Sequence, residues 1–139
     1  MRQLNRLLEQ ELRSEDTAIS DTAVLIERAR AARDALQHNR AEALMRRALR
    51  LSPGNRAALA VLCSILRARR RPQQALDETE EFQWTAYPPL LTSRAAALCD
   101  LNRWEEAKQE IGRALASGGS EEAFNVVHRI KAKRPDLYR

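Results

Sequence analysis

The sequence Trp-Glu-Glu-Ala-Lys at residues 104–108 has two counterparts earlier in the chain. They read Pro-Gln-Gln-Ala-Leu at residues 72–76 and Arg-Ala-Glu-Ala-Leu at residues 40–44. When the three stretches are aligned on Ala41, Ala75 and Ala107, the intervals between them are 34 and 32 residues. A repeat of about 34 residues is the length of one helix–turn–helix unit in repeat proteins. The spacing therefore predicts three consecutive helix pairs.

The residues around each aligned alanine support the same register. Seven positions later, the first and third units have small residues, Ala48 and Ala114, whereas the second unit has Phe82. Upstream, each first helix carries an apolar residue, a small residue four positions later and another apolar residue three positions beyond: Leu25-Ala29-Ala32, Leu59-Cys63-Leu66 and Leu91-Ala95-Leu98. Small residues let paired helices approach closely. We therefore expect these positions to form the core, with an irregular bend at residues 82–90.

Two stretches resemble a known repeat family. Residues 102–107 look like the turn and second-helix start of a tetratricopeptide repeat, and residues 49–55 resemble the end of one. The likeness covers roughly residues 22–121. It implies an all-α fold, a short right-handed α-solenoid in which the first helices of successive pairs line a concave groove.

The composition fits one helical domain. The chain has 139 residues, 44% of them apolar, and it is rich in Ala, Leu, Arg and Glu, which favour helices. We expect residues 1–139 to form a single tetratricopeptide-like domain, which begins with a helix over about 3–15 and a connection to residue 19. Helix pairs are expected within 20–55, 56–87 and 88–119, at residues 21–37 with 40–51, 56–69 with 72–84, and 89–101 with 104–117. Ser20 or Asp21 can cap the first pair, and a capping helix within 120–134 should bury Phe124, Val127 and Ile130.

Charged residues interrupt every apolar stretch of the chain, beginning with Met-Arg-Gln-Leu-Asn-Arg at the first residues. No stretch approaches the roughly 20 apolar residues that a membrane span needs, and we expect no signal peptide. Cys63 and Cys99 lack neighbours at metal-ligand spacing, which favours a reducing compartment. We therefore expect a cytoplasmic protein without a metal or a cofactor.

The sequence contains no motif typical of an enzyme. It has no phosphate-binding glycine loop, no nucleophile elbow and no paired histidines on a helix. His38 and His128 have no acid or thiol at a useful helical spacing. We therefore expect a non-catalytic protein.

The repeat register predicts which side chains line the groove. They are Ile26, Arg30, Arg33, Ala60, Ser64, Arg67, Thr92 and Ala96, with Cys99 as a further candidate. The set combines small or apolar side chains with three arginines. Such a surface suits a short helical or extended segment of another protein that carries acidic residues. The alternative is an ordinary solvated surface.

The resemblance also implies positions for one familiar ligand. Some tetratricopeptide domains hold the acidic C-terminal tail of heat-shock chaperones with a clamp of Lys, Asn and Arg side chains. In this sequence the clamp positions hold Ile26, Arg30, Val61, Pro89 and Ser93. Only Arg30 is cationic, so we do not expect this ligand.

Two further features suit either structure or binding. Phe82, Trp84 and Tyr87 bring half of the six aromatic residues to one corner, where they could anchor a partner or, as we favour, fill the gap left by the irregular second unit. The basic run at residues 67–71 could grip phosphates. It lies at an expected helix end, where cations offset the helix dipole, and the acids at residues 77–81 oppose it. We therefore expect the run to be structural and do not expect nucleic acid as the partner.

The sequence thus predicts an adaptor or scaffold that binds a partner segment in its groove. A narrower alternative is a bacterial chaperone, because residues 84–132 are loosely similar to the small tetratricopeptide chaperones of type III secretion needle subunits. A third alternative is a nucleic-acid-associated protein that uses its arginine clusters. The sequence leaves open whether the end helices pair into a homo-oligomer.

Overall fold

The computed structural model describes residues 21–139, and within that range every regular element is a helix. The longer helices are α3 (Thr22–Asp34), α4 (His38–Leu51), α5 (Arg56–Ala68), α6 (Pro72–Thr79), α7 (Pro88–Asp100), α8 (Trp104–Ser117) and α9 (Glu121–Lys133). Two short 3₁₀ helices are η1 (Glu80–Phe82) and η2 (Pro135–Tyr138). The all-α prediction is confirmed, whereas the helix expected at residues 3–15 and Ser20 as a cap lie outside the described residues.

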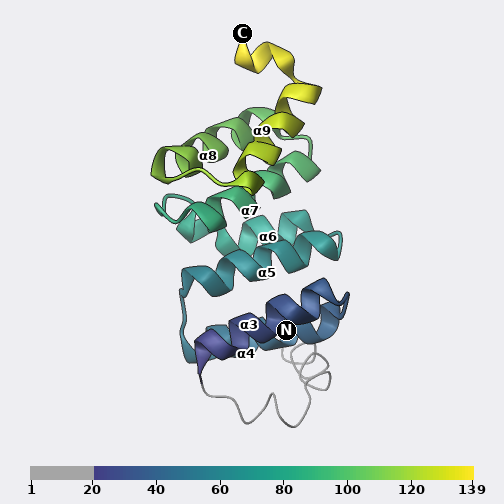
Figure 1. Ribbon diagram of the computed structural model, residues 1–139, viewed down its shortest axis with the longest axis vertical. Coiled ribbons are helices and arrows are strands. Elements are labelled where there is room, and N and C mark those ends of the chain that lie inside the picture. The colour runs from purple at the N-terminus through teal and green to yellow at the C-terminus, as the bar shows by residue number, and fades with distance from the viewer. Residues whose placement is uncertain (1–20) are drawn as a thin grey trace.

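The helices stack as successive pairs (Figure 1). Within each pair α3 packs on α4, α5 on α6, and α7 on α8, while contacts of α3 with α5 and of α5 with α7 join one pair to the next. Helix α9 packs on α7 and α8. It thus takes the place that the first helix of a fourth pair would have.

Three identical turns explain the repeat spacing. Leu36, Arg70 and Asn102 have positive φ angles of 63°, 62° and 59°. The amide after each one donates a hydrogen bond to a carbonyl five residues earlier: Gln37 to Ala32 (2.8 Å), Arg71 to Leu66 (2.8 Å) and Arg103 to Leu98 (2.9 Å). This is the Schellman ending of a helix, and it turns each first helix directly into the second.

Replacing Leu36 by glycine is expected to raise the free energy of unfolding by about 1 kcal/mol, because a left-handed conformation costs a non-glycine residue about that much. Leu36 is 76% exposed, so little apolar burial is lost. The urea midpoint of unfolding measures the effect. Asn102→Gly is the matched control: asparagine tolerates this conformation, so its gain should be smaller, and an equal or larger gain at Asn102 would contradict the explanation.

In the described part of the chain, three helices begin with a side-chain cap, whereas α7 begins with two prolines and no side-chain cap. Asp21, Asn55 and Ser120 precede α3, α5 and α9, and each side chain accepts a hydrogen bond from a first-turn amide. Side-chain caps of this kind satisfy amides that the helix leaves unpaired. The second helices α4, α6 and α8 begin from the tight turns without a side-chain cap.

The small residues of the repeat lie in the core as expected. Ala41, Ala75 and Ala107 are fully buried, and the three apolar triplets of the first helices are at most 5% exposed. The pairwise packing of α3, α5 and α7 on their second helices therefore rests on the register that the sequence predicts.

The second unit departs from the expected helix at residues 72–84. Helix α6 ends at Thr79, and η1 follows it. Phe82 and Tyr87 pack against a small separate cluster of Leu59, Ala60 and Leu90. These two rings therefore fill the space beside the irregular unit, as we favoured, whereas Trp84 is 74% exposed.

The buried face of α9 also differs from the prediction. Ala123, Val126 and Ile130 are buried there, Val127 is partly buried against the core, and Phe124 is 53% exposed. The ring of Phe124 lies instead over Gly119. The other expected helix boundaries agree within three residues.

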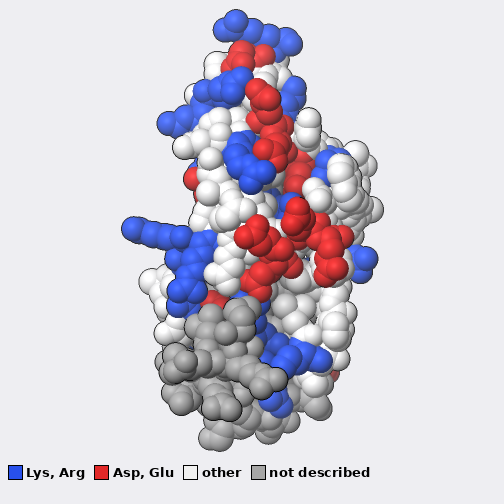
Figure 2. Space-filling model, turned by 180° about the vertical axis from the view of Figure 1, so that it is seen from behind, with Lys and Arg blue, Asp and Glu red and all other residues white. Residues whose placement is uncertain are grey.

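Charge is spread unevenly over the surface. Acidic side chains gather in the middle of the face that Figure 2 shows, and the exposed acids of α6, η1 and α8 are Asp77, Glu80, Glu81, Glu105 and Glu106.

Over residues 21–139, no helix is both long enough and apolar enough to cross a bilayer.

Candidate functional site

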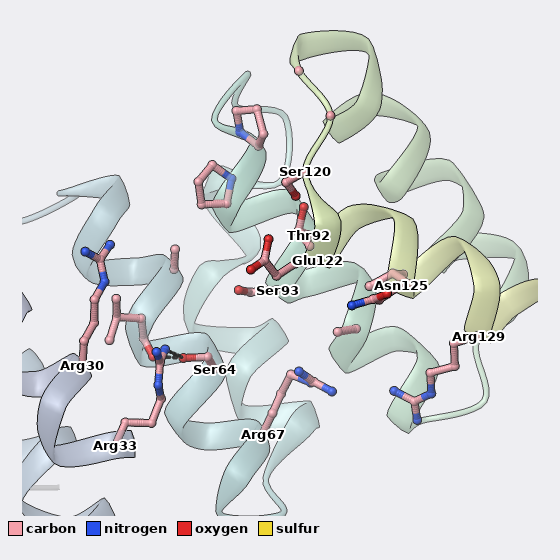
Figure 3. Close-up of a pocket in the computed structure, with 18 residues that line it drawn as sticks. Arg30, Arg33, Ser64, Arg67, Thr92, Ser93, Ser120, Glu122, Asn125 and Arg129 are labelled. Carbon is pink, nitrogen blue, oxygen red and sulfur yellow. Dashed lines mark hydrogen bonds between the residues drawn. The ribbon is translucent and has the colours of Figure 1, made fainter. Parts of the chain in front are cut away.

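A groove of about 770 Å³ runs across the first helices. Its floor is made of short side chains from α5 and α7, among them Ala60, Val61, Ser64, Ser93 and Ala96. Arg30 and Arg33 of α3 stand at one end, and α9 forms the wall at the other end (Figure 3). Pro88, Pro89 and residues 118–120, at the starts of α7 and α9, complete the lining.

Seven of the eight predicted groove residues line this groove: Arg30, Arg33, Ala60, Ser64, Arg67, Thr92 and Ala96. Ile26 does not. It is 6% exposed, because its side chain packs with that of Leu25 in the main core. Cys99 is 1% exposed and is likewise a core residue. That the seven bind a partner stays a prediction.

The sequence reasoning missed the contribution of α9. Glu122, Asn125, Val126 and Arg129 line the groove, although we expected this helix only to cap the array. A signal was present, because Ala123, Val127 and Ile130 lie 32 residues after the triplet Leu91-Ala95-Leu98. The register of the first helices therefore continues into α9.

A chain of polar contacts links the four groove helices. Arg33 Nη1 of α3 donates to Ser64 Oγ of α5 at 2.8 Å. On the next turn of α5, Arg67 donates from Nε and Nη2 to the two carboxylate oxygens of Asp100 at 2.7 and 3.2 Å. Arg129 Nη1 of α9 donates to the same carboxylate at 2.8 Å. Asp100, the last residue of α7, thus joins α5 to α9.

The groove is cationic. Among residues 21–139, four arginines, Arg30, Arg33, Arg67 and Arg129, line it against a single acid, Glu122. Arg30 also contacts Glu27 at 2.6 Å. In Figure 3 the arginines lie toward one side of the opening and Ser120 toward the other. A ligand in the groove therefore meets arginines along one side, and Ser120, Thr92 and the acid Glu122 along the other.

Asp100 remains ionised in this setting. Burial alone would raise the pKa of its carboxyl, but the hydrogen bonds from Arg67 and Arg129 outweigh burial and hold the pKa below its usual value. A carboxylate with a lowered pKa is charged at neutral pH. Arg67 and Arg129 are therefore neutralised in part.

The basic run at residues 67–71 is not opposed by the acids we expected. Arg67 pairs with Asp100, and Arg69 donates to Glu42 of α4 at 3.1 Å. Glu78, one of the acids at 77–81, pairs with Arg46 of α4 instead. Arg67 and Arg69 thus pair with acids on two different helices, α7 and α4, which favours a structural role for the basic run.

The aromatic corner is separate from the groove, because none of its three rings is among the groove-lining residues. The guanidinium of Arg113 lies 4.4 Å from the centre of the exposed Trp84 ring, within the range of a cation–π contact. The guanidinium of Arg56 lies 5.7 Å from the Phe82 ring. An anchoring role for these rings stays a prediction.

The thiols offer little reactivity. Burial raises the pKa of Cys63 to about 12, and burial also raises the pKa of Cys99. Thiolates are the reactive form, so both side chains act as small core residues. Among residues 21–139, no group of three or more His, Cys, Asp or Glu side chains could hold a metal ion.

Comparison with known proteins yields one family. A family model described as "Tetratricopeptide repeat" matches residues 1–120. No curated protein and no solved structure matches the chain. The narrower likeness to chaperones of secretion needle subunits stays a prediction.

Proposed function

The chain belongs to the tetratricopeptide repeat family, and from this membership and the groove we propose that it is a protein-interaction module that holds an acidic segment of a partner protein between α3 and α9. The observation that carries the proposal is the charge of the groove lining, four arginines against one glutamate. Charge complementarity of this kind speeds encounter and selects partners.

The floor supports a helical or extended occupant. Ala60, Ser64, Ser93 and Ala96 have short side chains, which leave room for the backbone of a second chain. Grooves with such floors accept amphipathic helices and extended peptides. The occupant's acidic residues would face the arginines, and its small or apolar residues would face Thr92 and the prolines.

A labelled alanine-based helical peptide with glutamates along one face tests the proposal. Fluorescence anisotropy should show that it binds at low ionic strength, and that a peptide with glutamine at the same positions binds more weakly. The double variant Arg30→Gln and Arg67→Gln should bind the acidic peptide about five- to tenfold more weakly, since each lost charge pair contributes up to about 1 kcal/mol.

The double variant Arg103→Gln and Arg134→Gln is the matched control. It removes the same charge from the exposed Arg103 and the partly exposed Arg134, which pair with acids outside the groove. At about 0.1 M salt its affinity for the acidic peptide should stay within about twofold of the wild type, because neither arginine lines the groove and the screening length is then about 10 Å. Equal losses in both double variants would show that net charge rather than the groove binds the peptide.

A further inference from the structure

An acid that is not part of the groove lining, Asp100, contacts two of the groove's arginines. The carboxylate of Asp100 accepts three hydrogen bonds, two from Arg67 and one from Arg129. Its side chain is 23% exposed, and it lines a neighbouring hollow that shares Ser64 and Arg67 with the groove. It contacts Arg67 and Arg129, two of the four arginines that bind an acidic ligand in the proposed function.

We propose that Asp100 is an internal competitor, which occupies Arg67 and Arg129 in the free protein and limits the affinity of the groove for acidic segments. The inference rests on the proposed function and names the residue that tunes it. A carboxylate of the ligand binds these guanidiniums beside Asp100 or in its place. The affinity of the groove for a ligand then depends on how well the ligand's carboxylate competes with that of Asp100 for Arg67 and Arg129.

The local charge balance supports this role. Arg67 and Arg129 together carry two positive charges, and Asp100 cancels one of them. Arg67 donates to Asp100 from Nε and Nη2, one of the two edges from which a guanidinium can bind a carboxylate bidentately. Bidentate pairing is the strongest geometry that arginine offers to a carboxylate. An incoming carboxylate therefore meets a pair of arginines whose net charge is halved and in which one bidentate edge of Arg67 is already occupied.

A purely structural role for Asp100 is less consistent with the packing. Helix α7 is already fixed to its neighbours by Leu91, Ala95 and Leu98, which are at most 2% exposed within the main core. On the far side, Ile130 of α9 is fully buried in the same core. The stack of α5, α7 and α9 thus has apolar contacts that do not involve the carboxylate.

The test measures binding of the same glutamate peptide to Asp100→Asn. We expect its affinity to rise about three- to tenfold, because one repulsive charge is removed and two guanidiniums are released. The affinity should also fall more steeply with salt than in the wild type. Glu106→Gln is the matched control: Glu106 pairs with the exposed Arg103 outside the groove, so it changes the net charge equally and should change affinity less than twofold.

The outcomes separate this inference from the proposed function. If the wild type binds the peptide through Arg30 and Arg67 but Asp100→Asn binds equally or more weakly, Asp100 only positions the arginines and the inference is wrong. If neither protein prefers the glutamate peptide to the glutamine peptide, the proposed function fails and the inference with it. Circular dichroism checks that the variant folds, and Asp100→Ser, which keeps a small polar side chain, replaces it if it does not.

Discussion

Replacing Arg94 by alanine is expected to lower the free energy of unfolding by about 3–5 kcal/mol, because it leaves the buried carboxylate of Glu110 without its hydrogen-bonded partner and with only Arg113, at 3.9 Å, as an ion-pair partner among residues 21–139. Arg94 and Glu110 have side chains only 5% and 7% exposed. Arg94 donates from Nε and Nη2 to Glu110 at 3.0 Å. It also donates from Nη1 to Thr79 Oγ1 at 2.7 Å and to the carbonyl of Leu76 at 3.0 Å. One side chain thus ties together α6, α7 and α8.

Urea unfolding followed by circular dichroism measures this loss. Arg103→Ala is the matched control, because Arg103 makes an equally close bidentate pair with Glu106 but is 40% exposed. Exposed pairs contribute less than about 1 kcal/mol. The double variant Arg94→Met and Glu110→Leu should be more stable than Arg94→Ala, since apolar residues can replace a buried pair at little cost. A loss below about 1 kcal/mol for Arg94→Ala would contradict the assigned role.

The same contacts explain why the second unit looks irregular in the sequence. Four positions after the aligned alanine, the first and third units have buried Met45 and Ile111, whereas the second has Thr79. A hydroxyl in this core position is favourable because Arg94 donates to it. The departure was visible in the sequence. Its cause was not, because the pairing joins Thr79 to a residue 15 positions away that no periodicity links to it.

The groove shows the same division between what spacing predicts and what it does not. Arg30, Ser64 and Arg67 could be placed because they project from helices of known register. Asp100 and Arg129 could not, since their importance arises only when long side chains from α5, α7 and α9 meet at one point. The repeat register predicts the position of each Cβ atom. It does not predict which carboxylate the long, flexible side chain of an arginine contacts.

Replacing Leu62 by alanine is expected to lower the free energy of unfolding by about 2–5 kcal/mol, because the change opens a cavity in a closed core. Leu62 is fully buried in α5, the helix that contacts α3, α4, α6 and α7. It stands 13 positions before Ala75, as Arg94 stands 13 before Ala107. The second unit therefore fills with a leucine the site that the third unit fills with its buried arginine.

The position of α5 also predicts how the Leu62→Ala protein unfolds. Each unit of a repeat array is stabilised by its neighbours, so a weakened central unit loosens the coupling between the α3–α4 and α7–α8 pairs. The urea transition should move to lower urea and become broader than in the wild type. Leu51→Ala is the matched control, because Leu51 is 48% exposed and the same deletion there should cost less than about 1 kcal/mol. A sharp transition with an unchanged slope would instead show that residues 21–139 unfold as one cooperative unit even when the central core is weakened.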